Sequence, residues 1–401
     1  MTEAAETTRE KVDLAHYIKA NIRDYALLIS LLVIMVFFQF NTNGTLFMPV
    51  NMTNIILQNS YIVIMALGML LIIVAGHIDL SVGSVSGFIG ALAAVLIVQW
   101  KVDVFVAGAI CIAVGGLIGA SQGYLTAYFR IPAFIVTLAG MLIYKGLALA
   151  VLGGASVGPF PKEFQLLSSG YVPDVFSLTL FGQPFNTLAL LLGAIVTAII
   201  IWSNMKERSA QMAHGVAEEP HGIFIARNIL IAVGFLGFTF LMARYKGLPN
   251  VLIVMFALIA LFTFVTTRTT FGRRIYAMGG NEKAAKLSGI NTERLTLLTF
   301  TIMGALAALA GLIFAARLNV ATPKAGLGFE LDVIAACFIG GAATTGGVGK
   351  VVGAVIGAFI MGVMNNGMSI MGIGIDWQQV IKGAVLLLAV VFDVYNKNKA
   401  S

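Results

Sequence analysis

The side chains most able to hold a metal or attack a substrate are four histidines and two cysteines. The histidines form no pair at metal-binding spacing and stand far apart at His16, His77, His214 and His221. Cys111 and Cys337 lie in apolar stretches, where a free thiol usually acts as a small packing residue. No Ser/His/Asp or Cys/His set can be assembled. We therefore expect no metal site and no catalytic centre, and we expect the chain not to be an enzyme.

The segment Gly346–Lys350, GGVGK, superficially resembles a phosphate-binding loop. That loop requires the frame Gly-x-x-x-x-Gly-Lys-Ser/Thr at the start of a helix that follows a strand. Here Val351 follows the lysine, and apolar sequence lies on both sides. We therefore expect this chain to bind no nucleotide and no other cofactor.

Asp79 is the most notable carboxylate close to apolar sequence, and such groups are costly inside a membrane and usually functional. Asp79 could instead cap the next helix, as could Ser81, and this interpretation is favoured. Two connections, Ala75–Ser86 and Gly340–Lys350, interrupt apolar sequence with glycine, hydroxyl or carboxylate side chains. Paired interruptions of this kind indicate a transport pathway, although two tight turns at the surface would give the same pattern.

The segment Arg268–Arg294 is a long basic stretch that includes Arg273 and Arg274. It contains a helix-forming run, Glu282–Leu287, followed by Gly289 where a helix often ends on glycine. A short helix of this kind is suited to docking in a groove of a partner. A solvated loop is the alternative, but the length and internal order of the segment weigh against it.

The composition places these residues in a membrane protein. The chain of 401 residues is 59% hydrophobic and 11% charged, with a net charge of +7 and a mean hydropathy of +0.95. Soluble domains carry about 25% charged residues. The basic residues are scattered among loops, which argues against a nucleic-acid partner.

A helix of roughly 20 apolar residues crosses a bilayer core of about 30 Å. We expect an all-α bundle with about twelve such spans, if the short piece Val333–Gly341 counts as one. The expected spans are Tyr25–Phe40, Asn54–Gly76, Val82–Trp100, Val104–Leu125, Ala133–Gly153, Thr187–Ser203, Asn228–Ala243, Val251–Thr267, Leu295–Ala316, Val333–Gly341, Val351–Ile370 and Val380–Val394.

Small residues recur at helical spacing on two of these spans, which lets helix backbones approach closely in lipid. They are Gly115, Gly116, Gly119, Ala120 and Gly123, and then Gly353, Gly357, Ala358 and Gly362. We expect both faces to pack against other helices of the bundle.

Lys and Arg favour cytoplasmic loops, and most of the 25 basic residues fall inside if both termini are cytoplasmic. The expected organisation is a cytoplasmic segment 1–24, a permease domain 25–395 with cytoplasmic loops 204–227 and 268–294, and a tail 396–401. The segment 1–24 could form a helix along the membrane surface or a frayed tail.

Several stretches resemble the monosaccharide permeases of ABC importers, most closely the xylose-type and multiple-sugar members. The matching stretches are GHIDLSVGS (76–84), IPAFIVTLAGMLIYKGLAL (131–149), FGRRIYAMGGNEKAAKLSGI (271–290), ELDVIAACFIGG (330–341), GGVGKVVGAVIGAFIMGVMNNGMS (346–369) and WQQVIKGAVLLLAVVFD (377–393). The chain departs from the ribose-type members by an additional pair of spans, Thr187–Ser203 and Asn228–Ala243, which xylose-type members share.

The resemblance implies a fold similar to that of the cobalamin-type importers, in a homodimeric permease of the bacterial inner membrane. It also implies a two-lobed ATPase subunit, which binds ATP and Mg²⁺, and a periplasmic sugar-binding protein. The residues Glu282, Ala284, Ala285 and Gly289 resemble the importer coupling motif, with the glutamate displaced by one place. That shift puts the exact role of Glu282 in doubt.

Sugar sites combine hydrogen-bonding side chains with aromatic faces, and several residues fit this description as candidates for a translocation pathway. They are Asp79, Ser81, Phe134, Asn365, Asn366, Trp377, Gln378 and Gln379, most of which could equally be packing or interface residues. We expect a permease for a monosaccharide such as xylose. An ion-coupled secondary transporter is the alternative, for which Asp79 would be the only fair buried carboxylate.

Overall fold

The computed structural model describes residues 22–174, 178–180, 183–214 and 219–400. The segment 1–21, for which a surface helix was one expectation, lies outside these residues. The chain divides into two compact units. The smaller one holds Met1–Ala26 and Val172–Leu248, and the larger one holds Leu27–Tyr171 and Pro249–Ser401.

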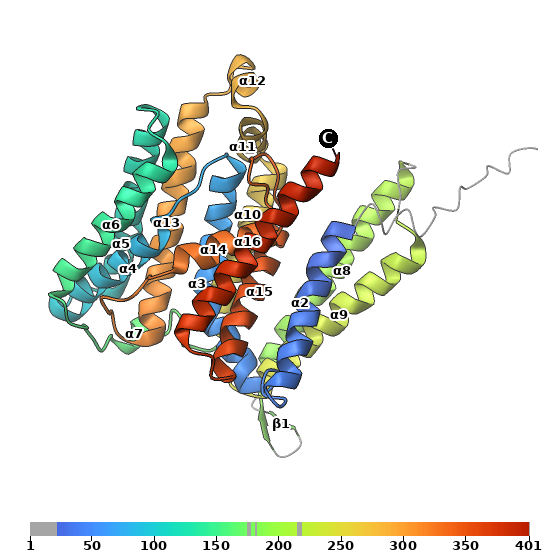
Figure 1. The fold of residues 1–401 in the computed structure, drawn as a ribbon. Helices are drawn as coiled ribbons and strands as arrows, with labels where there is room; N and C mark the ends of the chain where they lie inside the picture. The colour runs from blue at the N-terminus through green and yellow to red at the C-terminus, as the bar shows by residue number, and fades with distance from the viewer. Residues whose placement is uncertain (1–21, 175–177, 181–182, 215–218, 401) are drawn as a thin grey trace, which may run out of the picture. The chain divides into compact units, whose positions relative to one another are not determined.

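The described residues are predominantly helical, as expected for an all-α bundle (Figure 1). In chain order the elements are α2 (Ile22–Asn41), α3 (Pro49–Val74), α4 (Val82–Ala94) continued by a π-helical turn η1 (Val95–Gln99), α5 (Val104–Ala127), α6 (Ala133–Leu152), α7 (Lys162–Gln165), β1 (Leu178–Leu180), β2 (Gln183–Phe185), α8 (Thr187–Ala213), α9 (His221–Ala243), α10 (Asn250–Arg268), α11 (Thr270–Gly280), α12 (Glu282–Leu287), α13 (Thr292–Leu318), α14 (Phe329–Ile339), α15 (Val351–Ile370) and α16 (Ile375–Ala400).

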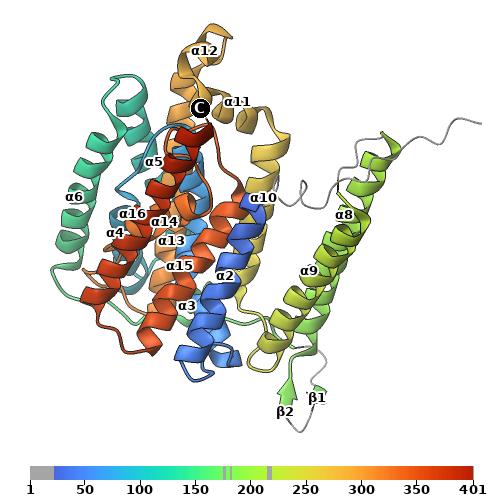
Figure 2. The same cartoon turned by 45° about the vertical axis from the view of Figure 1, so that its right-hand side comes forward.

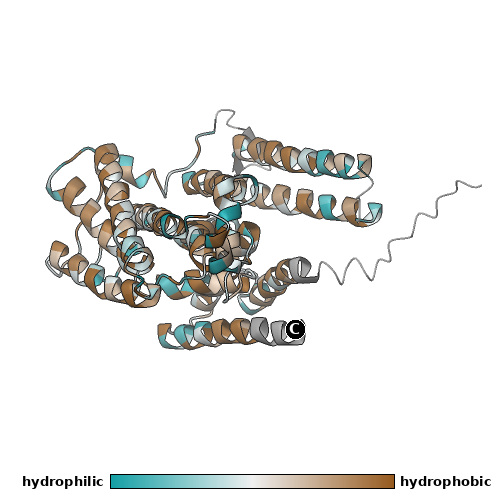
Figure 3. Cartoon of the chain, turned by 90° about the horizontal axis from the view of Figure 1, so that it is seen from above, coloured by the Kyte–Doolittle hydropathy of each residue, from teal (hydrophilic) through white to brown (hydrophobic). Residues whose placement is uncertain are grey.

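Within the described ranges, nine helices are long and apolar enough to cross a membrane. Hydrophobic residues cover the helices on their outward sides as well as their inward sides, as Figure 3 shows. A helix that is apolar on all sides is either a membrane span or deeply buried. The chain is therefore a multi-pass membrane protein, which confirms the predicted fold class.

Helix α3 forms the centre of the larger unit. It packs against α10, α13, α14 and α15, and nearly every side chain from Asn51 to Val74 is buried. Cys337 of α14 lies against it, with Sγ 3.5 Å from the carbonyl oxygen of Ala66. Cys111 and Cys337 are both buried free thiols, so their expected role as packing residues is confirmed.

The short piece expected at Val333–Gly341 is helix α14, and its length changes the interpretation of that crossing. Its 11 residues measure about 16 Å at 1.5 Å per residue, about half of the bilayer core. Turns occupy residues 323–328 immediately before it. A Cβ added at Gly326 would lie 2.0 Å from the carbonyl oxygen of Gly83, so this segment packs against the first turn of α4. Helix α14 alone is therefore too short to cross the bilayer core.

The two predicted interruptions of apolar sequence both contain a non-helical segment in the structure. The break before α4 is present, because residues 75–81 are non-helical. The segment 340–350 connects α14 to α15, and its Gly347 N–H donates to the carbonyl oxygen of Val74, next to the break before α4, over 2.9 Å. A further non-helical segment, 319–328, meets α4.

In the smaller unit, α8 and α9 pack against each other, and the hairpin β1–β2 pairs Leu178 with Phe185. The segment 204–227, expected as a loop, is largely helical because α8 continues to Ala213 and α9 begins at His221. Polar contacts hold these helix extensions together. Asn204 donates to Asn228 over 2.9 Å, and Arg227 pairs with Glu219 at 3.2 Å.

Two glycine faces hold the larger unit together, as expected. A Cβ at Gly119 of α5 would lie 2.1 Å from the carbonyl oxygen of Phe300 in α13. At Gly357 of α15 it would lie 2.0 Å from that of Ala336 in α14. Gly116 differs, because a Cβ there would meet only Thr301, at 4.0 Å.

We expect Gly119→Leu and Gly357→Leu to abolish most of the folded protein, because a backbone carbonyl cannot rotate out of the way. Overpacking alone costs about 1–3 kcal/mol, and a backbone clash costs more. Detergent-extracted yield and the monodisperse fraction in size-exclusion chromatography measure the effect. Gly116→Leu on the same helix is the matched control and should fold. A Gly119→Leu protein with normal yield would contradict this packing.

Candidate coupling site and interior polar clusters

The segment between α10 and α13 is well ordered because a side chain caps each of its helices. Thr269 accepts from the N–H of Gly272 at the start of α11, and Asn281 accepts from that of Ala284 at the start of α12. Asn291 accepts from the N–H of Arg294 at the start of α13. Gly289, with φ of +82°, follows α12 in the left-handed conformation that ends many helices. The predicted docking helix and its glycine end are thus present.

Helix α12 is the outermost element at one end of the larger unit in both side views (Figures 1 and 2). Of the two alanines in the predicted coupling motif, Ala285 is buried within the chain and Ala284 is exposed. The side chain that stands out is Leu287, which is 90% exposed. When a helix docks in a groove of a partner, the apolar side chains that it presents outward make the contacts.

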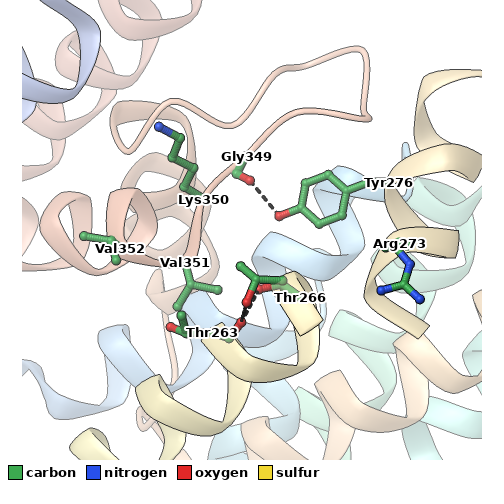
Figure 4. Close-up of a pocket in the computed structure, with 9 residues that line it drawn as sticks. Thr263, Thr266, Arg273, Tyr276, Gly349, Lys350, Val351 and Val352 are labelled. Atoms are coloured by element: carbon green, nitrogen blue, oxygen red, sulfur yellow. Dashed lines mark hydrogen bonds between the residues drawn. The ribbon is translucent and has the colours of Figure 1, made fainter. Parts of the chain in front are cut away.

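Helix α11 fixes this segment to the bundle. A Cβ at Gly279 would lie 1.6 Å from the carbonyl oxygen of Val74, the last residue of α3, and 2.7 Å from the nitrogen of Gly347. The hydroxyl of Tyr276 donates to the carbonyl oxygen of Gly349 over 2.6 Å (Figure 4). Helix α11 is therefore in direct contact with the end of α3 and with the turn before α15.

The predicted residues Arg273 and Arg274 lie on α11 with exposed side chains. Arg273 borders a cavity of about 460 Å³ that Tyr276, Gly349 and three threonines of α10 also line (Figure 4). Its guanidinium donates to the carbonyl oxygen of Arg268. Both arginines add positive charge to the surface beside α12.

Asp79 does not cap helix α4. One carboxylate oxygen, Oδ1, accepts from the N–H of Ser81 over 2.8 Å and from its hydroxyl over 2.7 Å. Gln122 of α5 donates to the same hydroxyl over 3.0 Å. Ser81 stands at the N-cap of α4, as one of the two alternatives expected, but no described side chain makes a capping hydrogen bond there. The capping interpretation was therefore wrong for Asp79. The two residues instead form a buried polar cluster that ties the break before α4 to α5.

A second buried polar cluster escaped the sequence analysis. Lys382 of α16 pairs with Asp332 of α14, with Nζ 3.0 Å from Oδ1 and 3.1 Å from Oδ2. Asn365 of α15 donates to Oδ2 over 3.2 Å. The side chain of Asp332 is 4% exposed and that of Lys382 18%. The signals in the sequence were two carboxylates opening α14, Glu330 and Asp332, and a lysine inside an apolar span.

Lys382→Met is expected to destabilise the protein by about 3–5 kcal/mol, because it leaves the carboxylate of Asp332 buried and unpaired. The double variant Asp332→Asn, Lys382→Met should recover most of that loss, since it removes both charges. Thermal unfolding in detergent measures the shift. The exposed Lys145 of α6 provides the control Lys145→Met, which should unfold near wild type. A Lys382→Met protein as stable as wild type would refute a structural role for the pair.

The remaining candidate pathway residues do not gather at one site. Asn366 exchanges two hydrogen bonds with Asn51 of α3, at 2.9 and 3.0 Å, and so acts in packing. Gln378 donates to the carbonyl oxygen of Ile373 and closes the turn before α16. Phe134 and Trp377 are exposed on α6 and α16. The predicted set is thus divided among two buried polar clusters, helix packing and the outer surface.

Comparison with known proteins defines the class. Residues 51–390 match the family described as "Branched-chain amino acid transport system / permease component". The xylose transport system permease protein XylH of Haemophilus influenzae is 40% identical over 379 residues, covering 94% of this chain and 98% of that protein. The Escherichia coli K12 protein of the same name is 37% identical, covering 95% and 94%.

The ribose import permease protein RbsC of Escherichia coli K12 is 33% identical over 389 residues, covering 96% of this chain and 98% of that protein. No solved structure matches the chain. The chain belongs to the family of ABC-importer permeases that includes these xylose and ribose permeases. The family resemblance inferred from the sequence is confirmed.

Proposed function

We propose that this chain forms the translocation pathway for a monosaccharide such as xylose in the bacterial inner membrane. Similarity to xylose permeases over 94–95% of the chain supports this substrate class. The structural observation that carries the proposal is α12, a capped and outward-facing helix with Leu287 90% exposed. Such a helix is suited to receive force from a separate motor subunit.

The proposed assembly contains two copies of this chain, an ATPase subunit and a periplasmic sugar-binding protein. ATP and Mg²⁺ bind the ATPase, while this chain binds no cofactor and hydrolyses nothing. Because α11 joins α12 to α3 and to the turn before α15, closure of the ATPase around α12 would move the ends of these helices. A ligand or partner shifts a conformational equilibrium only through contacts that differ between the two states.

Uptake of labelled xylose into proteoliposomes tests the proposal. The permease is reconstituted with its ATPase, and ATP and the loaded binding protein are supplied or withheld in turn. We expect uptake only when all components are present. Uptake driven by an ion gradient without ATP would overturn the proposal and favour a secondary transporter, which the comparisons do not support.

Both termini are expected in the cytoplasm, because this orientation places most Lys and Arg residues in cytoplasmic segments, as the positive-inside rule predicts. The basic residues that it places outside are Lys101, Lys162, Arg244, Lys246, Arg317 and Lys324. Single cysteines near Ser401 and at Lys162 can be probed with a membrane-impermeant thiol reagent in intact cells. Only the cysteine at Lys162 should react, because the native thiols are buried. Labelling of Ser401 from outside would reverse the orientation.

A further inference from the structure

A polar pocket of about 410 Å³ lies behind α12. It is bounded by α12, by the first turns of α13 and by the connection between α5 and α6. His77, from the break before α4, closes one side. The contacts that attach α11 to the rest of the larger unit, made by Tyr276 and Gly279, involve residues outside this pocket. The pocket is therefore not explained by the attachment of the coupling segment.

The charges around the pocket leave two cations without partners. Arg130 and Lys283 line it, and their side chains form no hydrogen bond or ion pair with any other residue that the structure describes. Lys286 is paired with Glu293, so those two charges cancel. Glu282 is the remaining acidic group. The pocket thus carries one net positive charge, with two cations free to contact an anion.

A buried hydroxyl also lacks a partner. Thr126 of α5 lines the pocket, is 8% exposed, and its Oγ1 has no hydrogen-bond partner among the described residues. Buried polar atoms in folded proteins are almost always satisfied by protein, water or ligand. Leaving one unsatisfied costs about 1–3 kcal/mol. The unsatisfied Oγ1 of Thr126 therefore indicates that a polar molecule occupies the pocket.

The start of α6 provides backbone donors at the same place. Pro132 stands at the N-cap and no described side chain caps the helix, while residues 131–133 line the pocket. The first N–H groups of a helix attract anions, phosphates above all. Arg130 is held beside them with φ of +56°, a strained conformation for a residue that is not glycine, and such strain is common at binding sites.

We propose that this pocket binds a small phosphate monoester, whose phosphate bridges Arg130 and Lys283 at the start of α6. The volume exceeds that of inorganic phosphate and suits a phosphorylated monosaccharide. Thr292 and Thr296 of α13 line the pocket and offer hydroxyls to the organic part of the ligand. Burial lowers the pKa of His77, so at neutral pH it contributes hydrogen bonds and no charge.

The bound ester would tie α12 to the connection between α5 and α6. It would therefore restrain the helix that we propose receives the ATPase, and would link transport to the level of phosphorylated sugar in the cytoplasm. This consequence rests on the proposed function, because it requires α12 to face the cytoplasm. The binding of the ester to this pocket does not depend on the proposed function.

Calorimetry on the purified permease in phosphatidylcholine nanodiscs tests the binding, with ribose 5-phosphate as the probe. We expect saturable binding, no binding of ribose, and at least a tenfold increase in Kd for Arg130→Gln and for Lys283→Gln. Thr126→Val should weaken binding less. Lys101→Gln is the matched control, because Lys101 is also basic, lies in a short connection and has φ of +56°.

A phosphate can also come from a lipid headgroup, and nanodiscs containing phosphatidic acid distinguish this source. Competition between that lipid and ribose 5-phosphate, lost in Arg130→Gln, would support the site with both ligands. Absence of binding from both sources, or binding unchanged in Arg130→Gln and Lys283→Gln, would overturn it. Failure of ATP-driven uptake with intact ester binding would instead refute the proposed function alone.

Discussion

Leu287→Asp is expected to abolish both ATP-driven uptake and co-purification of the ATPase subunit. Burying a leucine side chain in a partner's groove contributes about 1.5–3 kcal/mol, and a carboxylate in the same groove would add a desolvation cost. The fold should be unaffected, because Leu287 is 90% exposed. Affinity purification through a tag on the permease, followed by quantification of the ATPase, measures the loss.

The matched control is Leu166→Asp. Leu166 is 55% exposed and follows α7, away from α12 in Figure 1. Its backbone N–H donates to the carbonyl oxygen of Lys162, and its carbonyl oxygen accepts from Asn250. Its side chain takes no part in these bonds, so the ATPase should co-purify normally. Normal uptake and normal recovery of the ATPase with Leu287→Asp would show that α12 does not dock through this side chain.

Gly279→Val should uncouple ATP hydrolysis from transport, with uptake reduced by about 100-fold or more, equivalent to about 2.7 kcal/mol. Any Cβ at this position would overlap the carbonyl oxygen of Val74, which lies 1.6 Å from where that atom would be. The contact that joins α11 to α3 and to the turn before α15 would then open. The ratio of ATP hydrolysed to sugar imported in proteoliposomes measures the uncoupling.

The neighbouring glycine supplies the control. A Cβ at Gly280 would meet no described heavy atom within 4 Å, so Gly280→Val should transport at close to the wild-type rate. Both variants change one glycine at the end of the same helix, which matches their effect on helix propensity. If Gly279→Val is monodisperse and transports normally, force does not pass through this contact.

The spans could be predicted from the sequence because the bilayer sets the length of each apolar run. The ends of α5 and α6 in the structure lie within two residues of the bounds expected from the sequence. The role of α14 was harder to predict. Gly326 and Gly328 precede it, yet the glycine-rich segment after it gave the stronger signal for an interruption.

The site was less predictable because it depends on contacts between distant residues. The pairing of Asp332 with Lys382 joins residues that are 50 positions apart, and no local pattern indicates it. Which alanine of α12 faces outward is decided by the packing of that helix on the bundle, which buries Ala285. For the same reason Ala285→Trp would test folding, whereas Leu287→Asp tests docking.

The pairing of Asp332 with Lys382 has an electrical consequence. Moving one elementary charge across the membrane potential costs or releases about 2.3 kcal/mol per 100 mV. The two side chains sit on different helices, α14 and α16, with opposite charges 3.0 Å apart. As long as these helices move together, the displaced charges cancel and the membrane voltage does no net work on them. A rearrangement that separated α14 from α16 would make the import rate voltage-dependent.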